Sequence, residues 1–460
     1  MKKWVGVTAA IAMAAGIALP AAPGEALAKE ESHHEFSIKG FTDYAELTKK
    51  LQQIEQTSKG LVSVDVAGQS NQGRDIYTAR VGTGDKVVLI QSEIHGNEKT
   101  GTDAILSLLK TVSGSSPYAG QLREEITFVF MPMMNPDASV GDKRRNTMTW
   151  ADVVEDFPQL SGAQPSWNYL DRGVSQSYDY GKNPGFDVNR DFNPDLDYVP
   201  QPEDFPGSSS DPGWFITPES QTSRDVYKSL VGEFGKVDVF IDLHHQGIYY
   251  VEGTSDEVTL SLSAQFVPDP SSPDGADYAG YADTYNYDFS RQLNVAAYDA
   301  LQAKGDSIFN NITLYSQGLD LPGTALGSYA LNGSGTVLFE VTGQTQSFGQ
   351  KKRGQLVKAV ETGLLGIVNA VADGSVHDLN PEDYEEIPVR RTKIREEGPA
   401  AAGLLFQSNG QRERIKDPSF LPRRVRKDPA DKPGNPPNAI WKRLLLACTI
   451  ESDSRREWGR

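Results

Sequence analysis

Residues 86–112 read KVVLIQSEIHGNEKTGTDAILSLLKTV and contain a strand, a polar loop and a helix in close succession. The apolar run Val87–Ile90 predicts a short buried strand, and apolar residues at helical spacing predict a helix over Gly101–Val112. His95 and Glu98 stand in the loop between them, three residues apart, so both side chains can face one point. Imidazole nitrogen and carboxylate oxygen are suitable zinc ligands, although such a pair also occurs by chance.

The alternation of strands and helices continues along the chain. Further strands are predicted at Ile126–Met134, Val237–Leu243 and Thr336–Val341, and further helices at Pro218–Val231 and Gln355–Val371. This order predicts an α/β fold, with a mixed, mostly parallel twisted sheet covered by helices on both faces. Two long irregular stretches, 146–185 and 254–287, are predicted to form walls or lids of a site.

The composition excludes several classes of protein. An apolar fraction of 38% is enough for a sizeable core, which excludes wholesale disorder and a fibrous fold. The formal net charge of −17 would repel a polyanion, so nucleic acid is not an expected partner. A single cysteine, Cys448, excludes an intramolecular disulfide and any zinc site built from several thiolates. Nothing in the composition indicates an oligomeric state.

Residues 1–28 are predicted to be a signal peptide. Lys2 and Lys3 precede the apolar stretch Trp4–Ala22, and Ala26–Ala28 matches a small-x-small cleavage site. A membrane anchor is the alternative, but two prolines and a glycine interrupt the apolar run. No later stretch is expected to span a bilayer. The mature protein is therefore expected to be secreted, with or without association with the cell wall, and without stable membrane insertion.

Composition and charge divide the mature chain into regions. Residues 29–40 form a short N-terminal segment, 41–375 are expected to form one domain, and 376–390 are interpreted as an acidic linker. Residues 391–460 carry a net charge of +7, against −24 for the rest of the chain. This tail is predicted to be a disordered basic appendage. A wall- or membrane-binding arm and an out-of-frame end of the gene are the alternatives.

A second group of chemically active side chains lies at other predicted strand ends. His244 and His245 follow one strand, and Glu340 lies near the end of another. Ligands of open α/β sheets bind beyond the carboxyl ends of the strands. Two histidines and one glutamate would make the three-ligand set of a catalytic zinc, which leaves a fourth position for water. Taken singly, a core histidine and a solvated strand end are simpler explanations.

Asn189 and Arg190 place an amide beside a guanidinium. Arginine is the residue best shaped to hold a carboxylate with two parallel hydrogen bonds. A surface ion pair is the simpler explanation of Arg190 taken alone. The order of all these residues along the chain carries more information than any one of them.

Six motifs, in order, resemble those of the zinc carboxypeptidases of the carboxypeptidase A type, also called funnelins. They are Gly68–Arg74, His95–Glu98, Asn135–Asp137, Asp187–Arg190, Asp242–His244 and Phe339–Glu340. The resemblance extends from about Phe41 to Val371. With the signal peptide, it implies a secreted metallocarboxypeptidase that binds one Zn²⁺ per chain and hydrolyses the C-terminal bond of peptides or proteins.

The resemblance also implies a role for each matching residue. His95, Glu98 and His244 would bind the zinc, with His244 preferred to His245 by its position in the motif. The remaining matches are Asp187, which would orient the first histidine; Asn189 and Arg190, which would hold the substrate's α-carboxylate; and Glu340, which would act as general acid/base on a zinc-activated water.

Three further positions carry implied roles. Arg145, or alternatively Arg144 or Arg172, would polarise the scissile carbonyl. Tyr315 resembles the family's mobile tyrosine, which closes over the substrate. Ala325 would line the bottom of the specificity pocket, where a small neutral side chain favours apolar or aromatic C-terminal residues.

Two other functions use the same residues. A hydrolase of peptidoglycan cross-linking peptides, of the γ-glutamyl-diamino acid type, would use the same zinc and Glu340. It would instead recognise a D-configured or diamino acid carboxylate. A non-catalytic binding protein on the same scaffold is the other alternative. The presence of a full ligand set together with Glu340 argues against it.

Overall fold

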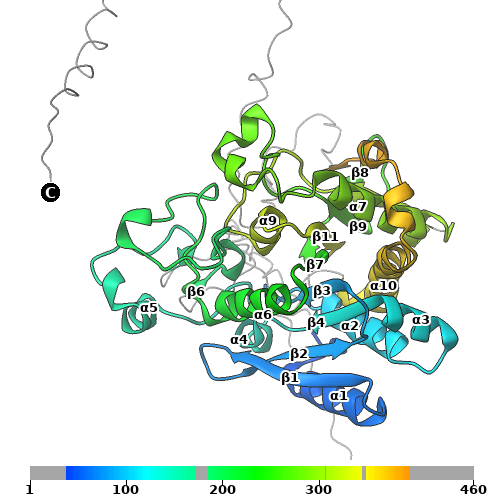
Figure 1. The fold of residues 1–460 in the computed structure, drawn as a ribbon, viewed down its shortest axis with the longest axis horizontal. Helices are drawn as coiled ribbons and strands as arrows, with labels where there is room; N and C mark the ends of the chain where they lie inside the picture. The colour runs from blue at the N-terminus through cyan, green and yellow to red at the C-terminus, as the bar shows by residue number, and fades with distance from the viewer. Residues whose placement is uncertain (1–37, 171–184, 306, 344–348, 393–460) are drawn as a thin grey trace, which may run out of the picture. The chain divides into compact units, whose positions relative to one another are not determined.

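An eight-stranded mixed sheet organises the chain, in the order β1-β2-β4-β3-β7-β11-β9-β10 (Figure 1). The computed structural model describes residues 38–170, 185–305, 307–343 and 349–392. The strands are β1 (Val62–Gln69), β2 (Asp75–Val81), β3 (Lys86–Ser92), β4 (Ile126–Met131), β7 (Val239–Gln246), β9 (Leu260–Ser263), β10 (Ile312–Leu314) and β11 (Gly335–Thr342). The four central strands, β4, β3, β7 and β11, run parallel. Antiparallel pairing occurs between β1 and β2, β2 and β4, and β9 and β11. The predicted α/β class and mixed sheet are confirmed.

Helices cover both faces of this sheet (Figure 1). The first face carries α2 (Thr100–Val112), α7 (Tyr287–Gln302) and α10 (Gly349–Asp373), and the second carries α6 (Pro218–Phe234) and α9 (Ala325–Leu331). Along β3, Val88 and Ile90 pack in the first core while Val87 and Leu89 pack in the second. Successive side chains of a strand point to opposite faces, so a strand covered on both faces needs an unbroken apolar run.

Helix α6 begins and ends where its sequence requires. The Thr217 side chain accepts a hydrogen bond from the Ser220 amide, and Pro218 occupies the first helical position. Gly235 ends the helix with a φ of +82°, a left-handed conformation that glycine adopts without steric cost. The N-terminal boundary agrees with the sequence prediction.

The two stretches predicted to be irregular contain regular structure. Within 254–287 lie β9, which pairs with β10 and β11 in the main sheet, and a 3₁₀ segment at Pro273–Tyr281. Within 146–185 lies α5 (Trp150–Asp156), and residues 171–184 fall outside the described part of the chain. The remaining elements are α1 (Tyr44–Thr57), α3 (Pro117–Glu125), α4 (Pro136–Val140), α8 (Ser307–Asn310) and the short pairs β5 (Tyr169–Leu170) with β6 (Gly185–Phe186) and β8 (Tyr250–Val251) with β12 (Arg390–Arg391).

Residues 375–391, here called the C-terminal strap, pack against the domain. Residues 376–390 of this segment are expected from the sequence to be an acidic linker, but they are packed against the domain. Tyr384 and Ile387 are buried in a cluster with residues of α7 and β10. Arg291 of α7 pairs with Glu382 and Glu385 of the strap. Buried apolar residues spaced between acids anchor the strap, while the acids face solvent or Arg291.

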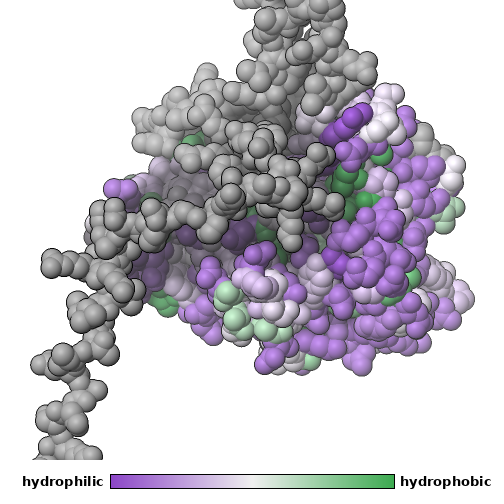
Figure 2. Space-filling view, turned by 90° about the horizontal axis from the view of Figure 1, so that it is seen from above, coloured by the Kyte–Doolittle hydropathy of each residue, from purple (hydrophilic) through white to green (hydrophobic). Residues whose placement is uncertain are grey.

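One helix of the described residues, Lys352–Asp373, is long and apolar enough to cross a membrane by length and composition. No such stretch is expected from the sequence after residues 1–28. This segment belongs to α10, whose apolar side chains lie in the core with those of α2 and α7. Packing inside the domain explains its composition. On the face drawn in Figure 2, the described surface is mostly hydrophilic, with small hydrophobic areas between.

The ends of the chain lie outside the described residues. These parts are residues 1–37, with the predicted signal peptide, and 393–460, with almost all of the basic tail. Their predicted roles therefore stay predictions.

Candidate metal centre and active site

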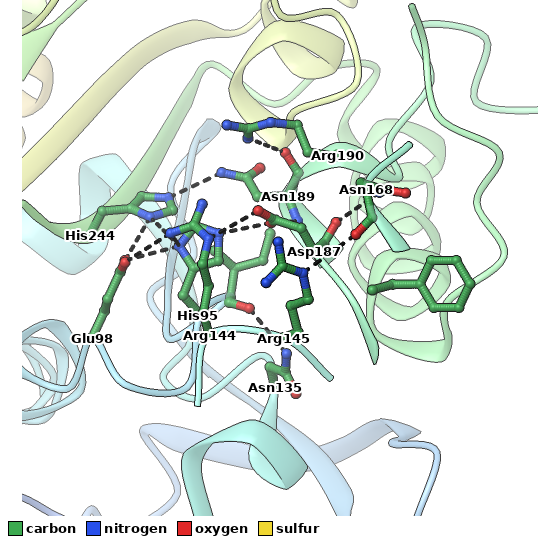
Figure 3. Close-up of polar contacts among 12 residues, drawn as sticks. His95, Glu98, Asn135, Arg144, Arg145, Asn168, Asp187, Asn189, Arg190 and His244 are labelled. Carbon is green, nitrogen blue, oxygen red and sulfur yellow. Dashed lines mark hydrogen bonds and ion pairs between the residues drawn. The ribbon is translucent and has the colours of Figure 1, made fainter. Parts of the chain in front are cut away.

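Three side chains converge at the carboxyl ends of β3 and β7 (Figure 3). His95 Nδ1 lies 3.1 Å from Glu98 Oε2, His244 Nδ1 lies 2.9 Å from the same oxygen, and the two Nδ1 atoms are 3.2 Å apart. Tetrahedral zinc with bonds of about 2.0 Å places neighbouring ligand atoms roughly 3.3 Å apart. The spacing and donor types of this buried cluster fit a zinc ion.

The loop after β3 holds two of these ligands in a tight turn. Glu93 adopts a left-handed φ of 52°, and its buried carboxylate accepts a hydrogen bond from Thr102 Oγ1 and lies 3.5 Å from Lys99 Nζ. Gly96 stands between the ligands, where a Cβ atom would lie 2.1 Å from the Ala138 carbonyl carbon. The loop therefore requires glycine at position 96. The contacts of Glu93 with Thr102 and Lys99 hold the rest of the loop in place.

Acidic side chains behind the two histidines determine which nitrogen of each ring faces the cluster. Asp187 Oδ1 lies 3.0 Å from His95 Nε2, and Asp242 Oδ2 lies 2.9 Å from His244 Nε2. A carboxylate at Nε2 favours a proton there, which leaves Nδ1 of each ring free to bind a metal. Burial would raise the pKa of Asp187, but Arg144 and His95 outweigh it and hold that pKa well below its usual value.

His245 points away from this cluster. Its Nε2 accepts a hydrogen bond of 3.0 Å from the Thr100 amide, at the start of α2. Burial lowers the pKa of His245 to about 4, so the ring is neutral at physiological pH. Successive strand residues face opposite sides, which places His244 with the ligands and His245 beneath the helix.

Arg144 is the arginine that contacts the ligand cluster (Figure 3). Its Nε donates to Asp187 Oδ2 at 3.0 Å, and its Nη1 lies 3.2 Å from His95 Nδ1 and 3.4 Å from Glu98 Oε1. The preferred candidate from sequence, Arg145, instead donates from Nε toward the Asn168 carbonyl at 3.5 Å. Arg172, the third candidate, lies outside the described residues. Geometry therefore favours Arg144 over Arg145.

Glu340 faces the cluster from the neighbouring strand. It lies directly opposite His244 in the β7–β11 register and is 8% exposed. Burial raises the pKa of Glu340 to about 8, and the nearby Glu98 adds to this rise while His244 opposes it. A carboxyl group with a pKa near neutrality can both accept and return a proton.

Arg190 is a buried guanidinium that forms no ion pair with the described residues. It is 6% exposed, its Nη1 donates to the Asn189 carbonyl at 2.6 Å, and its Nε has no hydrogen-bond partner in the part of the chain that the structure describes. The side chain of Asn189 accepts a hydrogen bond from the Ala325 amide and lies 3.4 Å from His244 Nε2. The predicted carboxylate-binding pair thus lies beside the ligand cluster.

Comparison with known families agrees with this arrangement. The model of the zinc carboxypeptidase family matches residues 47–360, which is more than half of the chain.

The chain belongs to the zinc carboxypeptidase family.

Two solved structures are among those similar to this chain. The carboxypeptidase A of Helicoverpa armigera is 17% identical, with 73% of this chain and 74% of that chain covered and a TM-score of 0.45. A metallo-carboxypeptidase of Burkholderia cenocepacia is 16% identical, with coverage of 71% and 69% and a TM-score of 0.43. The family and the three-residue cluster together make this protein a zinc peptidase.

The remaining predicted residues of this zinc carboxypeptidase lie around the same point. Tyr315 stacks on Phe266, with ring centroids 6.4 Å apart, and its amide donates to the Leu262 carbonyl. Ala325 is fully buried at the start of α9, packed in the second core. The contact of its amide with Asn189 shows a structural role, and its role in specificity stays a prediction.

Sequence reasoning missed four residues of this region. Asp242 belongs to one of the six motifs but has no predicted role, although its place two residues before His244 puts both on one face of the strand. Arg390, Gln246 and Tyr249 had no signal in the sequence. They meet because the C-terminal strap docks beside β7.

Proposed function

We propose that this zinc peptidase is a secreted metallocarboxypeptidase that removes C-terminal residues from peptides. The observation that carries the proposal is the buried guanidinium of Arg190 beside the metal cluster, which has no ion pair among the described residues. A peptide bond next to a chain end differs from internal bonds by the free carboxylate beside it. Arg190 offers that carboxylate charge-assisted hydrogen bonds in a water-poor environment, with the Asn189 amide nearby.

The residues around the cluster supply the other functions that the reaction needs. Zinc held by His95, Glu98 and His244 would act as a Lewis acid that polarises the scissile carbonyl and lowers the pKa of water. Glu340 would take a proton from the attacking water and return it to the leaving amine. Its raised pKa supports both transfers near neutral pH.

Arg144 would stabilise the negative charge that develops on the carbonyl oxygen. Its guanidinium is held on one side by Asp187 and reaches the cluster with Nη1. A donor fixed before the reaction begins needs no reorganisation when charge appears, which is why such groups contribute strongly to catalysis.

Export is the second part of the proposal. The basic start, apolar stretch and cleavage site of residues 1–28 support it. Expression of the full chain in a bacterial host, with mass spectrometry of the mature N-terminus, tests it. Cleavage after Ala28 is expected, and retention of the N-terminus in the cytoplasm would contradict export.

The exopeptidase character is tested with one peptide in two forms, a free C-terminal acid and the C-terminal amide. The wild type should strongly prefer the acid, and Arg190→Ala should lose most of that preference, a change on the order of several kcal/mol in transition-state stabilisation. Arg145→Ala is the matched control, because Arg145 lies nearby and lacks the direct contact with the ligands. Equal cleavage of acid and amide by the wild type would favour an endopeptidase or amidase.

A further inference from the structure

The C-terminal strap brings a second arginine to the site. Strand β12 pairs with β8, and Arg390 stands opposite Val251. The Pro388 carbonyl accepts a hydrogen bond from the Leu314 amide, one residue before Tyr315. The strap therefore runs along the segment that carries Tyr315, and Arg390 is fixed by backbone pairing on both sides of it.

The guanidinium of Arg390 is held between two aromatic rings. Its central carbon lies 3.8 Å from the ring centre of Tyr315 and 4.1 Å from that of Tyr249. Its Nη1 donates to Gln246 Oε1, and its Nη2 donates to Ser316 Oγ at 3.1 Å. Stacking and hydrogen bonds to neutral acceptors hold the group in place while leaving its charge uncompensated.

Arg390 forms no ion pair with the described residues, unlike Arg291 and Arg353. Arg291 pairs with two glutamates of the same strap, and Arg353 pairs with Asp103. Glu340 is close enough for Arg390 to lower its pKa, against the larger effect of burial, yet the two form no ion pair. Arg390 is half-buried, so a substrate can reach it.

We propose that Arg390 binds a second carboxylate of the substrate, that of an acidic side chain within one residue of the scissile bond. The inference rests on the proposed function, in which Arg190 takes the terminal carboxylate. Arg390 lies on another element, next to Tyr315 and near Glu340, so one carboxylate does not satisfy both arginines. The site therefore selects peptides with an acidic residue at the last or the penultimate position.

The test compares peptide pairs that differ by glutamate against glutamine, at the last position in one pair and at the penultimate position in the other. All peptides carry a free C-terminus, and kcat/KM is measured for the zinc-loaded full chain. The wild type should prefer glutamate at one of the two positions by about tenfold, the effect of one hydrogen-bonded charge pair. Arg390→Ala should reduce this ratio to near one.

Two further variants separate this role from folding. Arg391→Ala is the matched control. Arg391 is the next residue along the strap, and its exposed side chain donates a hydrogen bond to the Thr254 carbonyl. Arg391→Ala should keep the wild-type ratio. Gln246→Glu keeps Arg390 and places a carboxylate on it from inside the protein, so it should also abolish the preference for glutamate. This variant decides the question if Arg390→Ala fails to fold.

The outcomes distinguish the two proposals. A wild type that cleaves glutamate and glutamine peptides equally at both positions overturns the role of Arg390 and leaves the carboxypeptidase intact. A glutamate preference that survives in Arg390→Ala or in Gln246→Glu overturns it as well. A wild type that cleaves none of the free-acid peptides refutes the proposed function itself.

Discussion

The metal cluster and the two arginines beside it differ in how their charges are paired. His95, Glu98 and His244 each lie within ion-pair distance of an oppositely charged side chain: Asp187 is behind His95, Asp242 is behind His244, and Arg144 lies against Glu98. Arg190 and Arg390, by contrast, have hydrogen bonds to neutral acceptors and no ion pair among the described residues.

This difference separates residues that maintain the site from residues that bind the substrate. A buried charge without a partner costs stability, so a fold keeps one where a ligand supplies the partner. The paired groups hold fixed geometry in the absence of substrate. In the two proposals above, the arginines without an ion pair among the described residues are the positions at which a peptide carboxylate lowers the free energy of the complex.

The largest expected effect concerns the paired region. His244→Ala removes a ligand from the cluster, so zinc binding and peptidase activity should both be lost. His245→Ala should keep one zinc per chain, because His245 accepts from the Thr100 amide and not from the cluster; it should cost about 1 kcal/mol of stability. Metal analysis of the two purified variants measures the difference. Full zinc content in His244→Ala with loss in His245→Ala would reverse the assignment.

A smaller effect on activity is expected when Glu340, which faces the metal cluster but is not one of its three residues, is replaced. Glu340→Gln keeps the size of the side chain and removes its proton transfer, so kcat should fall by roughly 10² to 10⁴-fold. Zinc content and KM should change little, because Glu340 is not among the three converging ligands. A variant that retains a tenth or more of the turnover would show that another group moves the proton.

The sequence was sufficient for the parts of this site that depend on local pattern. The apolar run of β3, the cap at Thr217 and the position of His244 at a strand end all follow from residues close together in the chain. These signals predict the sheet class, which is confirmed, and the three residues that converge in the candidate metal cluster.

The parts that were missed depend on long-range contacts. Helix α7 is not predicted from the sequence. It contains the buried polar residues Ser290, Arg291 and Asn294, which break its apolar pattern. Ser290 and Asn294 are tolerated because they bond the backbone of Thr336 on β11. The choice between Arg144 and Arg145 depends on how the loop after α4 is packed, which a sequence does not reveal.

The stability of Arg190→Met tests most directly the claim that unpaired arginines serve the substrate. Methionine fills the same space without a buried charge, so the free energy of unfolding of this variant should stay within about 1 kcal/mol of the wild type, or rise above it. Arg144→Met is the paired control and should lose roughly 2 kcal/mol, because the buried carboxylate of Asp187 loses its guanidinium partner. Urea unfolding of the zinc-loaded chains gives both values. The account predicts a stable Arg190→Met protein with strongly reduced kcat/KM, and it is contradicted if Arg190→Met is destabilised as much as Arg144→Met.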